Sequence, residues 1–315
     1  MTEEPLLSFD AFIRHWAAER PENIALEEGT ARSSFADLDR RTRQAIAVLQ
    51  ELGVAKGDRV AWLGKNAKIY FELFYACGRM GAVMVPIGWR LAVPEVRYIL
   101  EDTGAKVLFT GDDCGGAAAE ACGGMAQPPR VVSASEAEHR LTAAVPTDFE
   151  PAGPNDAVLQ LYTSGTTGNP KGAVLSNANL FALRVPAAAA DEPWSRWEEG
   201  EAILVAMPCA HIGGTGLGIM ALAGGVRAIV QAEFTPEGVL TAFEQGVTRM
   251  FIVPAALQMV IQHPRAATTD FSAVRYVLYG AAPIPLELLR EAVRTIPNAG
   301  FIQCYGMTET TGTVS

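Results

Sequence analysis

The chain has 315 residues, 49% of them hydrophobic and 19% charged, so it is long enough to bury a large core and too apolar to be disordered. Its 25 basic and 35 acidic residues give a formal net charge of −10, which argues against nucleic acid or an anionic membrane surface as a partner. Five widely spaced cysteines without a Cys-x-x-Cys pair are typical of reduced thiols in a cytoplasmic protein, not of a zinc site.

Helix and strand patterns alternate along most of the chain. A helix is predicted from Ser34 to Gly53, because Ser34 and Asp37 form a capping pattern and glycine commonly ends a helix. Helical spacing recurs over residues 68–80 and 94–102. Short apolar runs predict strands over residues 59–63, 82–86, 106–110, 157–162, 202–207, 226–230, 249–253, 274–278 and 301–304. This alternation predicts the α/β class, with layered, mostly parallel sheets flanked by helices.

Two stretches depart from the simple alternation. Residues 111–154 are rich in glycine, alanine and proline, so we expect a boundary there between two α/β subdomains, residues 1–150 and residues 151–315. Residues 202–226 have no charged side chain except His211 when it is protonated. Pro208 and several glycines interrupt this second stretch, which predicts a buried strand, a loop and a short helix, not a transmembrane segment.

A loop rich in glycine and hydroxyl side chains follows the strand predicted at residues 157–162. It reads YTSGTTGNPKG from Tyr162 to Gly172. Glycine lets backbone N–H groups approach an anion, hydroxyl groups add donors, and a lysine adds positive charge, so the loop predicts a polyphosphate site. The residues expected to bind the polyphosphate are Thr163, Ser164, Gly165, Thr166, Thr167, Gly168 and Lys171.

Two other interpretations of this loop are weaker. A Walker A loop requires serine or threonine directly after its lysine, whereas Lys171 is followed by Gly172. A surface loop without a ligand agrees with the composition, but it does not explain why the whole segment from Tyr162 to Gly172 suits a polyphosphate. The loop resembles the phosphate-binding loop of the adenylate-forming superfamily: acyl-CoA synthetases, firefly luciferase and the adenylation domains of peptide synthetases. The whole chain is similar to the front part of these proteins, the large N-terminal domain of their fold.

A second motif near the end of the chain supports the same resemblance. It reads QCYGMTET from Gln303 to Thr310, and YGAAP precedes it from Tyr279. The resemblance implies that Tyr305 stacks on adenine, which suits the stacking of a purine on an aromatic face. It also implies that Thr308 contacts the α-phosphate and that Glu309 binds Mg²⁺, a cation that prefers oxygen ligands. The other residues implied to contact the nucleotide or its metal are Thr163, Gly280, Ala281, Ala282, Gln303, Cys304, Gly306 and Met307.

The segment MPCAHIGGTGLG, from Met207 to Gly218, resembles the part of the family that borders the acyl pocket. His211 falls where the family often has histidine or an aromatic residue beside the carboxylate. No acidic residue lies between Glu201 and Glu233, so the α-ammonium of an amino acid would have no partner there. We therefore expect a fatty, aryl or polycyclic acid, for which the glycines at 213, 214, 216 and 218 leave space. The implied substrate-binding residues are His211, Gly213, Gly214, Leu217, Tyr279 and Gly280.

The resemblance implies activation of a carboxylic acid by ATP and Mg²⁺ as its acyl-AMP, followed by transfer to coenzyme A. Catalysis is expected from Lys171, Thr308, Glu309 and His211. Mg²⁺, Lys171 and the loop N–H groups would counter the repulsion between the two anions that react. Full-length relatives continue into a small C-terminal catalytic domain, so we expect residues 1–315 alone to adenylate slowly or not at all. Delivery to a carrier protein, a non-catalytic nucleotide- or acyl-binding role, and assembly as a homo-oligomer stay open.

Overall fold

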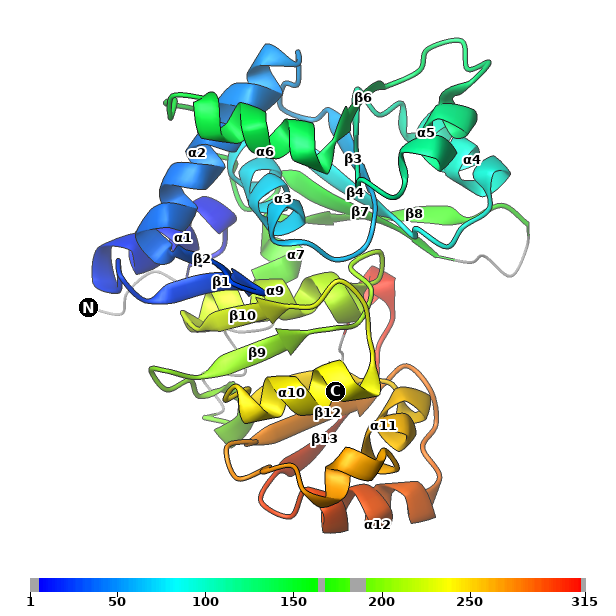
Figure 1. The fold of residues 1–315 in the computed structure, drawn as a ribbon. Coiled ribbons are helices and arrows are strands. Elements are labelled where there is room, and N and C mark those ends of the chain that lie inside the picture. Colours follow the sequence, from blue (N-terminus) through cyan, green and yellow to red (C-terminus); the bar gives the residue numbers. More distant parts are fainter. Residues whose placement is uncertain (1–5, 164–167, 182–190, 313–315) are drawn as a thin grey trace.

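The computed structural model describes residues 6–163, 168–181 and 191–312 and contains two β-sheets with helices between and outside them (Figure 1). The strands are β1 (Ile24–Glu28), β2 (Ala31–Ser34), β3 (Arg59–Leu63), β4 (Val83–Ile87), β5 (Val107–Thr110), β6 (Arg130–Ser133), β7 (Ala157–Thr163), β8 (Lys171–Ser176), β9 (Ala202–Val205), β10 (Arg227–Val230), β11 (Arg249–Ile252), β12 (Tyr276–Gly280) and β13 (Gly300–Cys304). The α-helices are α1 (Phe9–Glu19), α2 (Phe35–Glu51), α3 (Lys68–Met80), α4 (Val93–Thr103), α5 (Gly115–Cys122), α6 (Ala134–Ala143), α7 (Asn177–Phe181), α9 (Ile212–Gly224), α10 (Pro236–Glu244), α11 (Pro254–Ile261) and α12 (Leu286–Thr295). Three 3₁₀ helices complete the described residues: η1 (Pro193–Ser195), η2 (Pro264–Ala267) and η3 (Thr308–Thr310).

The strand order confirms the predicted α/β class with mostly parallel sheets. One sheet has seven strands in the order β13-β12-β11-β9-β10-β1-β2, and the other has six in the order β6-β5-β3-β4-β7-β8. Within the described residues, only the pairs β1–β2 and β7–β8 are antiparallel. β1 and β2 join the sheet built mainly from the second half of the chain, while β7 and β8 join the sheet built from the first half. A division of the chain at residue 150 therefore does not separate the two sheets.

Helices cover both faces of each sheet because both faces are apolar. The largest buried cluster lies between the sheets and includes residues of α2, α3 and α9 (Figure 1). A second cluster joins the outer face of the seven-stranded sheet to α10, α11 and α12, and a third joins the outer face of the six-stranded sheet to α4 and α5. Burial on both faces explains why strands such as β4 and β9 are apolar at every position.

Local sequence signals account for several element boundaries. The Ser34 side chain accepts a hydrogen bond from the Asp37 N–H and the Asp37 carboxylate accepts one from the Ser34 N–H, so the predicted capping box starts α2. Residues 202–226 form β9, a loop and α9, as predicted, and no described helix is long and apolar enough to span a bilayer. Residues 111–154, which lacked a clear pattern, nevertheless contain α5, β6 and α6, because packing of Ala118, Ala137 and Leu141 stabilises them.

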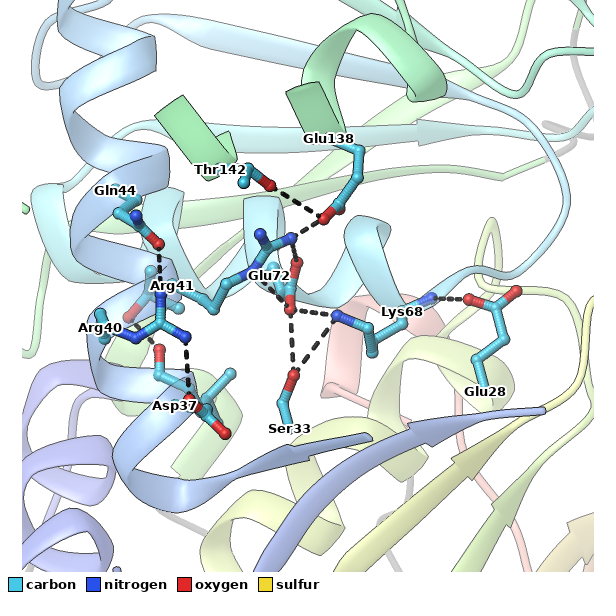
Figure 2. Close-up of polar contacts among 12 residues, drawn as sticks. Glu28, Ser33, Asp37, Arg40, Arg41, Gln44, Lys68, Glu72, Glu138 and Thr142 are labelled. Atoms are coloured by element: carbon cyan, nitrogen blue, oxygen red, sulfur yellow. Dashed lines mark hydrogen bonds and ion pairs between the residues drawn. The ribbon is translucent and has the colours of Figure 1, made fainter. Parts of the chain in front are cut away.

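A charged network ties β2, α2, α3 and α6 together (Figure 2). The Glu72 side chain is fully buried and accepts hydrogen bonds from Arg41 and Lys68 and a longer one from the Ser33 hydroxyl. Arg41 also reaches the half-exposed carboxylate of Glu138 at 2.6 Å. Burial alone would lower the pKa of Arg41, but the hydrogen bonds and charges of Glu72 and Glu138 outweigh it and raise that pKa, so Arg41 keeps its charge.

Candidate active site

The carboxyl ends of the parallel strands in both sheets meet in one region. A cavity of about 280 Å³ is lined by residues that follow or end β4 and β7 in one sheet and by residues of the loop after β9 in the other. In parallel sheets, such edges are where ligands commonly bind, because connecting loops rather than helices surround them. The sequence-predicted motifs lie in the loops at this edge.

The β7–β8 hairpin holds the predicted phosphate loop. Thr163 pairs directly with Lys171 in the antiparallel register. The residues at the two ends of the loop therefore lie side by side on neighbouring strands. The Tyr162 hydroxyl donates to Asp102 on α4, and the Tyr98 hydroxyl donates to the Pro170 carbonyl at 3.3 Å. Burial and the Asp102 carboxylate raise the pKa of Tyr162, so this hydroxyl keeps its proton. The ends of the loop are thus fixed to α4.

Part of the predicted phosphate loop is not described. Ser164, Gly165, Thr166 and Thr167 lie outside the described residues. Gly168 is described and has a φ of 127°, a backbone conformation that favours glycine. Lys171 is exposed and forms no ion pair with another described residue.

The second motif starts at the carboxyl ends of the neighbouring strands β12 and β13. Gly280 pairs with Cys304, and a Cβ at Gly280 would lie 2.1 Å from the Cys304 carbonyl oxygen, so this close approach requires glycine. Ala281 follows with a φ of 64°, a strained backbone conformation for a residue with a side chain. Strain of this kind often accompanies a binding turn, and Ala281 lines a cavity.

The two motifs meet although they belong to different sheets. The 3₁₀ helix η3, which carries Thr308 and Glu309, packs against β8, which begins at Lys171. The Thr310 hydroxyl accepts a hydrogen bond from the Met307 N–H at 3.0 Å, which fixes the start of η3. Glu309 is exposed, and the Tyr305 side chain is 68% exposed. An exposed aromatic ring beside a cluster of polar residues is a suitable surface for stacking a nucleotide base.

A cavity of about 430 Å³ lies beside these motifs, between α9 and the strand ends of the seven-stranded sheet. The predicted site residues that line it are His211, Gly213, Gly214, Leu217, Ala281, Cys304, Gly306, Met307 and Thr308. Tyr279 and Gly280 end β12, Gln303 lies in β13, and Ala282 and Tyr305 follow these two strands. None of these five residues lines the cavity. Cavity-lining residues that the sequence analysis did not name as binding residues include Met220, Phe251 and Leu278.

His211 lies where the two cavities adjoin. It lines both the 280 Å³ cavity and the 430 Å³ cavity, and it is the N-cap residue of α9, although its side chain makes no capping hydrogen bond. Although the residue is exposed on one side, surrounding protein atoms desolvate the ring and lower its pKa below the ordinary value. His211 is therefore neutral at pH 7 and can donate or accept a hydrogen bond.

The glycines of α9 differ in what they face. A Cβ at Gly214 would lie 2.3 Å from the Pro208 carbonyl oxygen, and a Cβ at Gly218 would lie 2.1 Å from the Phe71 ring. A Cβ at Gly213 would come within 2.9 Å of Phe251. The expectation that all of these glycines leave space for a substrate is therefore wrong for 213, 214 and 218, whose missing side chains are replaced by protein atoms. At Gly216, by contrast, an added Cβ would meet only the Ile212 side chain at 3.8 Å, an ordinary contact distance.

The cavity loop is positioned by a residue that the sequence analysis missed. Asn66 is 4% exposed, accepts a hydrogen bond from the Cys209 N–H at 2.8 Å and donates to the carbonyls of Met207 and Gln231. It thereby joins the loop before α3 to the loop before α9, across the two sheets. An asparagine in a short polar segment has no sequence signal for this role, because its partners lie far along the chain.

Thr163 and Glu309 were the predicted Mg²⁺ ligands. Both side chains offer oxygen atoms. Thr163 lies in the β7–β8 hairpin and Glu309 lies on η3, which packs against β8. The described residues contain no group of three or more His, Cys, Asp or Glu side chains able to hold a metal. This donor set fits Mg²⁺ that keeps waters and binds mainly to substrate phosphates, with one protein carboxylate.

Comparison with known proteins identifies the family. The model of the AMP-binding enzyme family matches residues 13–315. The chain belongs to this family. It is 35% identical over 89% of its length to a fatty acid–[acyl-carrier-protein] ligase of Streptomyces coeruleorubidus, covering 54% of that protein. It is 38% identical over 92% of its length to a feruloyl-CoA synthase of an Amycolatopsis species, covering 57% of that protein.

A solved structure agrees with the family fold. The inhibitor-bound N-terminal domain of FACL13 from Mycobacterium tuberculosis superposes with a TM-score of 0.87 at 31% identity, covering 97% of this chain and 77% of that one. The similarity confirms the predicted large N-terminal domain of the adenylate-forming fold. The chain spans little more than half the length of the curated relatives that it matches.

Proposed function

We propose that the protein containing this chain activates a carboxylic acid with ATP and Mg²⁺ and transfers the acyl group to the thiol of coenzyme A. The observation that carries the proposal is the packing of η3 against β8, which brings the elements of Lys171 and Glu309 together beside an apolar cavity. A polyphosphate site next to an apolar cavity with a neutral imidazole suits an apolar acid and a nucleotide.

The proposed residues act by holding charge and position. A carboxylate oxygen of the substrate attacks the α-phosphorus of ATP, and pyrophosphate leaves. Lys171, the loop N–H groups and the Thr308 hydroxyl stabilise the negative charge on the phosphates, while His211 holds the substrate carboxylate without adding or removing a proton. Glu309 and Thr163 would hold Mg²⁺, which would supply positive charge against the phosphates. The acceptor sulfur then attacks the acyl carbon, and AMP leaves.

ATP–pyrophosphate exchange on the complete gene product tests this proposal. Exchange should depend on an added acid, and Lys171→Ala and Glu309→Gln should each lower kcat/KM for ATP by about tenfold or more. Glu192→Gln, a change at an exposed carboxylate in another part of the surface, serves as the control. Exchange without any acid requirement, or unchanged exchange in both site variants, would contradict the proposal.

A carrier-protein acceptor is the second candidate, because one relative, at 35% identity, is a fatty acid–[acyl-carrier-protein] ligase. Both acceptors offer the same kind of thiol, which belongs to a small molecule in coenzyme A and is attached to a protein in the carrier. A product assay with free coenzyme A and, separately, with a phosphopantetheinylated carrier protein distinguishes them. We expect the acyl-CoA product, and formation of acyl-carrier product alone would favour the second candidate.

A further inference from the structure

Two side chains of α4 contact the ends of the phosphate loop. Tyr98 and Asp102 are spaced i, i+4, which places them on one face of the helix, one turn apart. The Tyr98 hydroxyl donates to the Pro170 carbonyl at 3.3 Å, and the Asp102 carboxylate accepts a hydrogen bond from the Tyr162 hydroxyl. Neither α4 residue belongs to the phosphate loop or to the motif around Glu309.

Each contact falls one residue before a side chain that is proposed to act on the phosphates. Pro170 precedes Lys171, and Tyr162 precedes Thr163. Lys171 and Thr163 are paired across the β7–β8 hairpin, so a shift of one end of the loop also moves the other. Lys171 is exposed and forms no ion pair with another described residue. The position of its side chain therefore follows from its backbone, which the bond to Pro170 holds.

The helix α4 is a rigid base for these contacts. Val96, Ile99 and Leu100 are each 1% exposed and pack in the cluster that joins α4 to the six-stranded sheet. The Glu95 carboxylate accepts a hydrogen bond from the Ala92 N–H at 2.8 Å, which fixes the first turn of the helix. The two polar side chains therefore belong to a helix whose position does not depend on the loop.

A third residue directs the Tyr162 hydroxyl toward α4. The Gln160 amide donates to the Tyr162 oxygen at 3.2 Å, which leaves the hydroxyl proton for Asp102. Gln160 is 6% exposed, and a Cβ added at Gly172 would lie 2.3 Å from its amide nitrogen. A side chain at 172 would displace Gln160, so the glycine beside Lys171 preserves this orientation of the hydroxyl.

These contacts are better suited to setting a position than to stabilising the fold. The bond between Tyr162 and Asp102 is exposed to solvent, and the bond from Tyr98 is partly buried. An exposed hydrogen bond contributes little to folding because water replaces it, whereas a displacement of about 1 Å at a catalytic group can lower a rate by about a hundredfold. Loss of these contacts should therefore change catalysis more than stability.

We propose that Tyr98 and Asp102 are positioning residues, which hold Lys171 and Thr163 where the phosphates of ATP bind. The inference rests on the proposed function, because it assigns the phosphates to this loop. Neither α4 side chain needs to touch the nucleotide, since each acts through the residue that it holds at one end of the loop. Loss of both contacts should impair the use of ATP and leave binding of the acid unchanged, because other residues line the apolar cavity.

ATP–pyrophosphate exchange by the complete gene product measures the effect, with dodecanoate and 4-hydroxycinnamate as the acids. Tyr98→Phe and Asp102→Ala should each lower kcat/KM for ATP by about three- to tenfold, and the double variant by more than about tenfold. KM for the acid should change by less than about twofold. Asp102→Asn keeps an oxygen acceptor for the Tyr162 hydroxyl and should restore most of the rate.

Two controls distinguish positioning from damage to the fold. Glu101→Ala should leave exchange unchanged, since Glu101 is the exposed neighbour of Asp102 on α4 and its side chain forms no hydrogen bond or ion pair with another described residue. Melting temperatures of all these variants should lie within about 2 °C of the parent value. The acid-induced shift, which is the rise in melting temperature that a bound acid causes, should also be the same in the variants and the parent.

A double-mutant cycle isolates the bond between Tyr162 and Asp102. Tyr162→Phe removes the same hydrogen bond as Asp102→Ala, so combining the two changes should lower kcat/KM for ATP little more than the larger single loss does. Independent losses that multiply in the double variant would show that the two side chains act separately, and would overturn the positioning role of Asp102.

The outcomes separate this inference from the proposed function. Normal exchange in the parent that is unchanged in the Tyr98→Phe/Asp102→Ala variant would overturn the inference and leave the proposed function intact. If no acid supports exchange, the proposed function fails, and affinity for Mg²⁺·ATP, measured by isothermal titration calorimetry, tests the inference instead. It should be weaker in the double variant by about threefold or more. Equal affinities, or no binding by the parent, would overturn the inference.

Discussion

Two polar regions of this molecule use charge in opposite ways. In the network of Figure 2, Glu72 is fully buried and both of its cationic neighbours, Arg41 and Lys68, are bonded to it. In the candidate site, Lys171 and Glu309 are exposed, and neither forms an ion pair with another described residue. A buried charge needs its partners, so that removing one of them destabilises the fold, whereas exposed charges without a partner among the described residues are available to a ligand.

Cavity volume alone does not identify the candidate active site. A depression of about 660 Å³ borders the network and is larger than the cavity beside α9. Arg41, Glu138 and Lys68 line it, but they are bound within the network. The smaller cavity is apolar and lies beside the motifs of Lys171 and Glu309, which form no ion pair with another described residue, and an apolar pocket with a few polar groups is typical of ligand sites.

The largest effect is expected from breaking the buried network. Glu72→Ala leaves Arg41 and Lys68 without their shared carboxylate and should lower the free energy of unfolding by about 3–5 kcal/mol. Urea unfolding followed by circular dichroism measures the change. Glu136→Ala removes the partner of Arg140 from an exposed pair on α6 and is the control. Equal losses in the two variants would show that the network does not stabilise the fold as described.

Removing Asn66 should have an intermediate effect, on the stability of the fold and on the loop that leads to the candidate site. Asn66→Ala leaves the Cys209 N–H and two carbonyls without a buried partner, which should cost about 1–3 kcal/mol of unfolding free energy. Because the freed loop leads to His211, the acid-induced shift in melting temperature should also decrease. Asn23→Ala, which removes a solvent-exposed hydrogen bond from the Asn23 side chain to Glu199, should change neither quantity appreciably. An unaffected acid-induced shift in Asn66→Ala would separate this loop from the cavity.

Substitutions in the candidate site should change binding but hardly change stability. Glu309→Gln keeps the shape of the side chain and should alter the free energy of unfolding by less than about 0.5 kcal/mol. If Glu309 binds the metal as proposed, affinity for Mg²⁺·ATP, measured by isothermal titration calorimetry, should fall by about tenfold or more. A stability loss like that of Glu72→Ala would mean that Glu309 serves the fold and not a ligand.

The smallest expected effect concerns the protonation of His211. Burial lowers its pKa below the ordinary value of 6.5, so the folded protein disfavours the charged ring. The stabilisation from this neutral ring is complete above the unfolded-state pKa and is lost as the pH falls through the lower folded-state pKa. Imidazole NMR signals assigned with His211→Gln should titrate with a midpoint below 6.5. A midpoint above that value would indicate an acidic partner near the ring.

Much of the fold could be predicted from local sequence patterns. The strand and helix of residues 59–63 and 68–80 match β3 and α3, because apolar runs and helical spacing depend on near neighbours in the chain. The assignment of strands to sheets could not be predicted. β1 and β2 pair with β10 and its sheet, and β7 with β4, through contacts between residues far apart in the sequence.

The sequence by itself determined the family, because the phosphate loop and the motif around Glu309 are continuous segments whose residue types alone indicate what they bind. Only the tertiary structure decided that η3 packs against β8, that Asn66 positions the loop before α9, and that Gly216 faces the cavity while Gly218 faces Phe71. The physical reason is the same in each case. A glycine or an asparagine gains its role from the atoms opposite it, and those atoms come from elements that only the folded chain brings near.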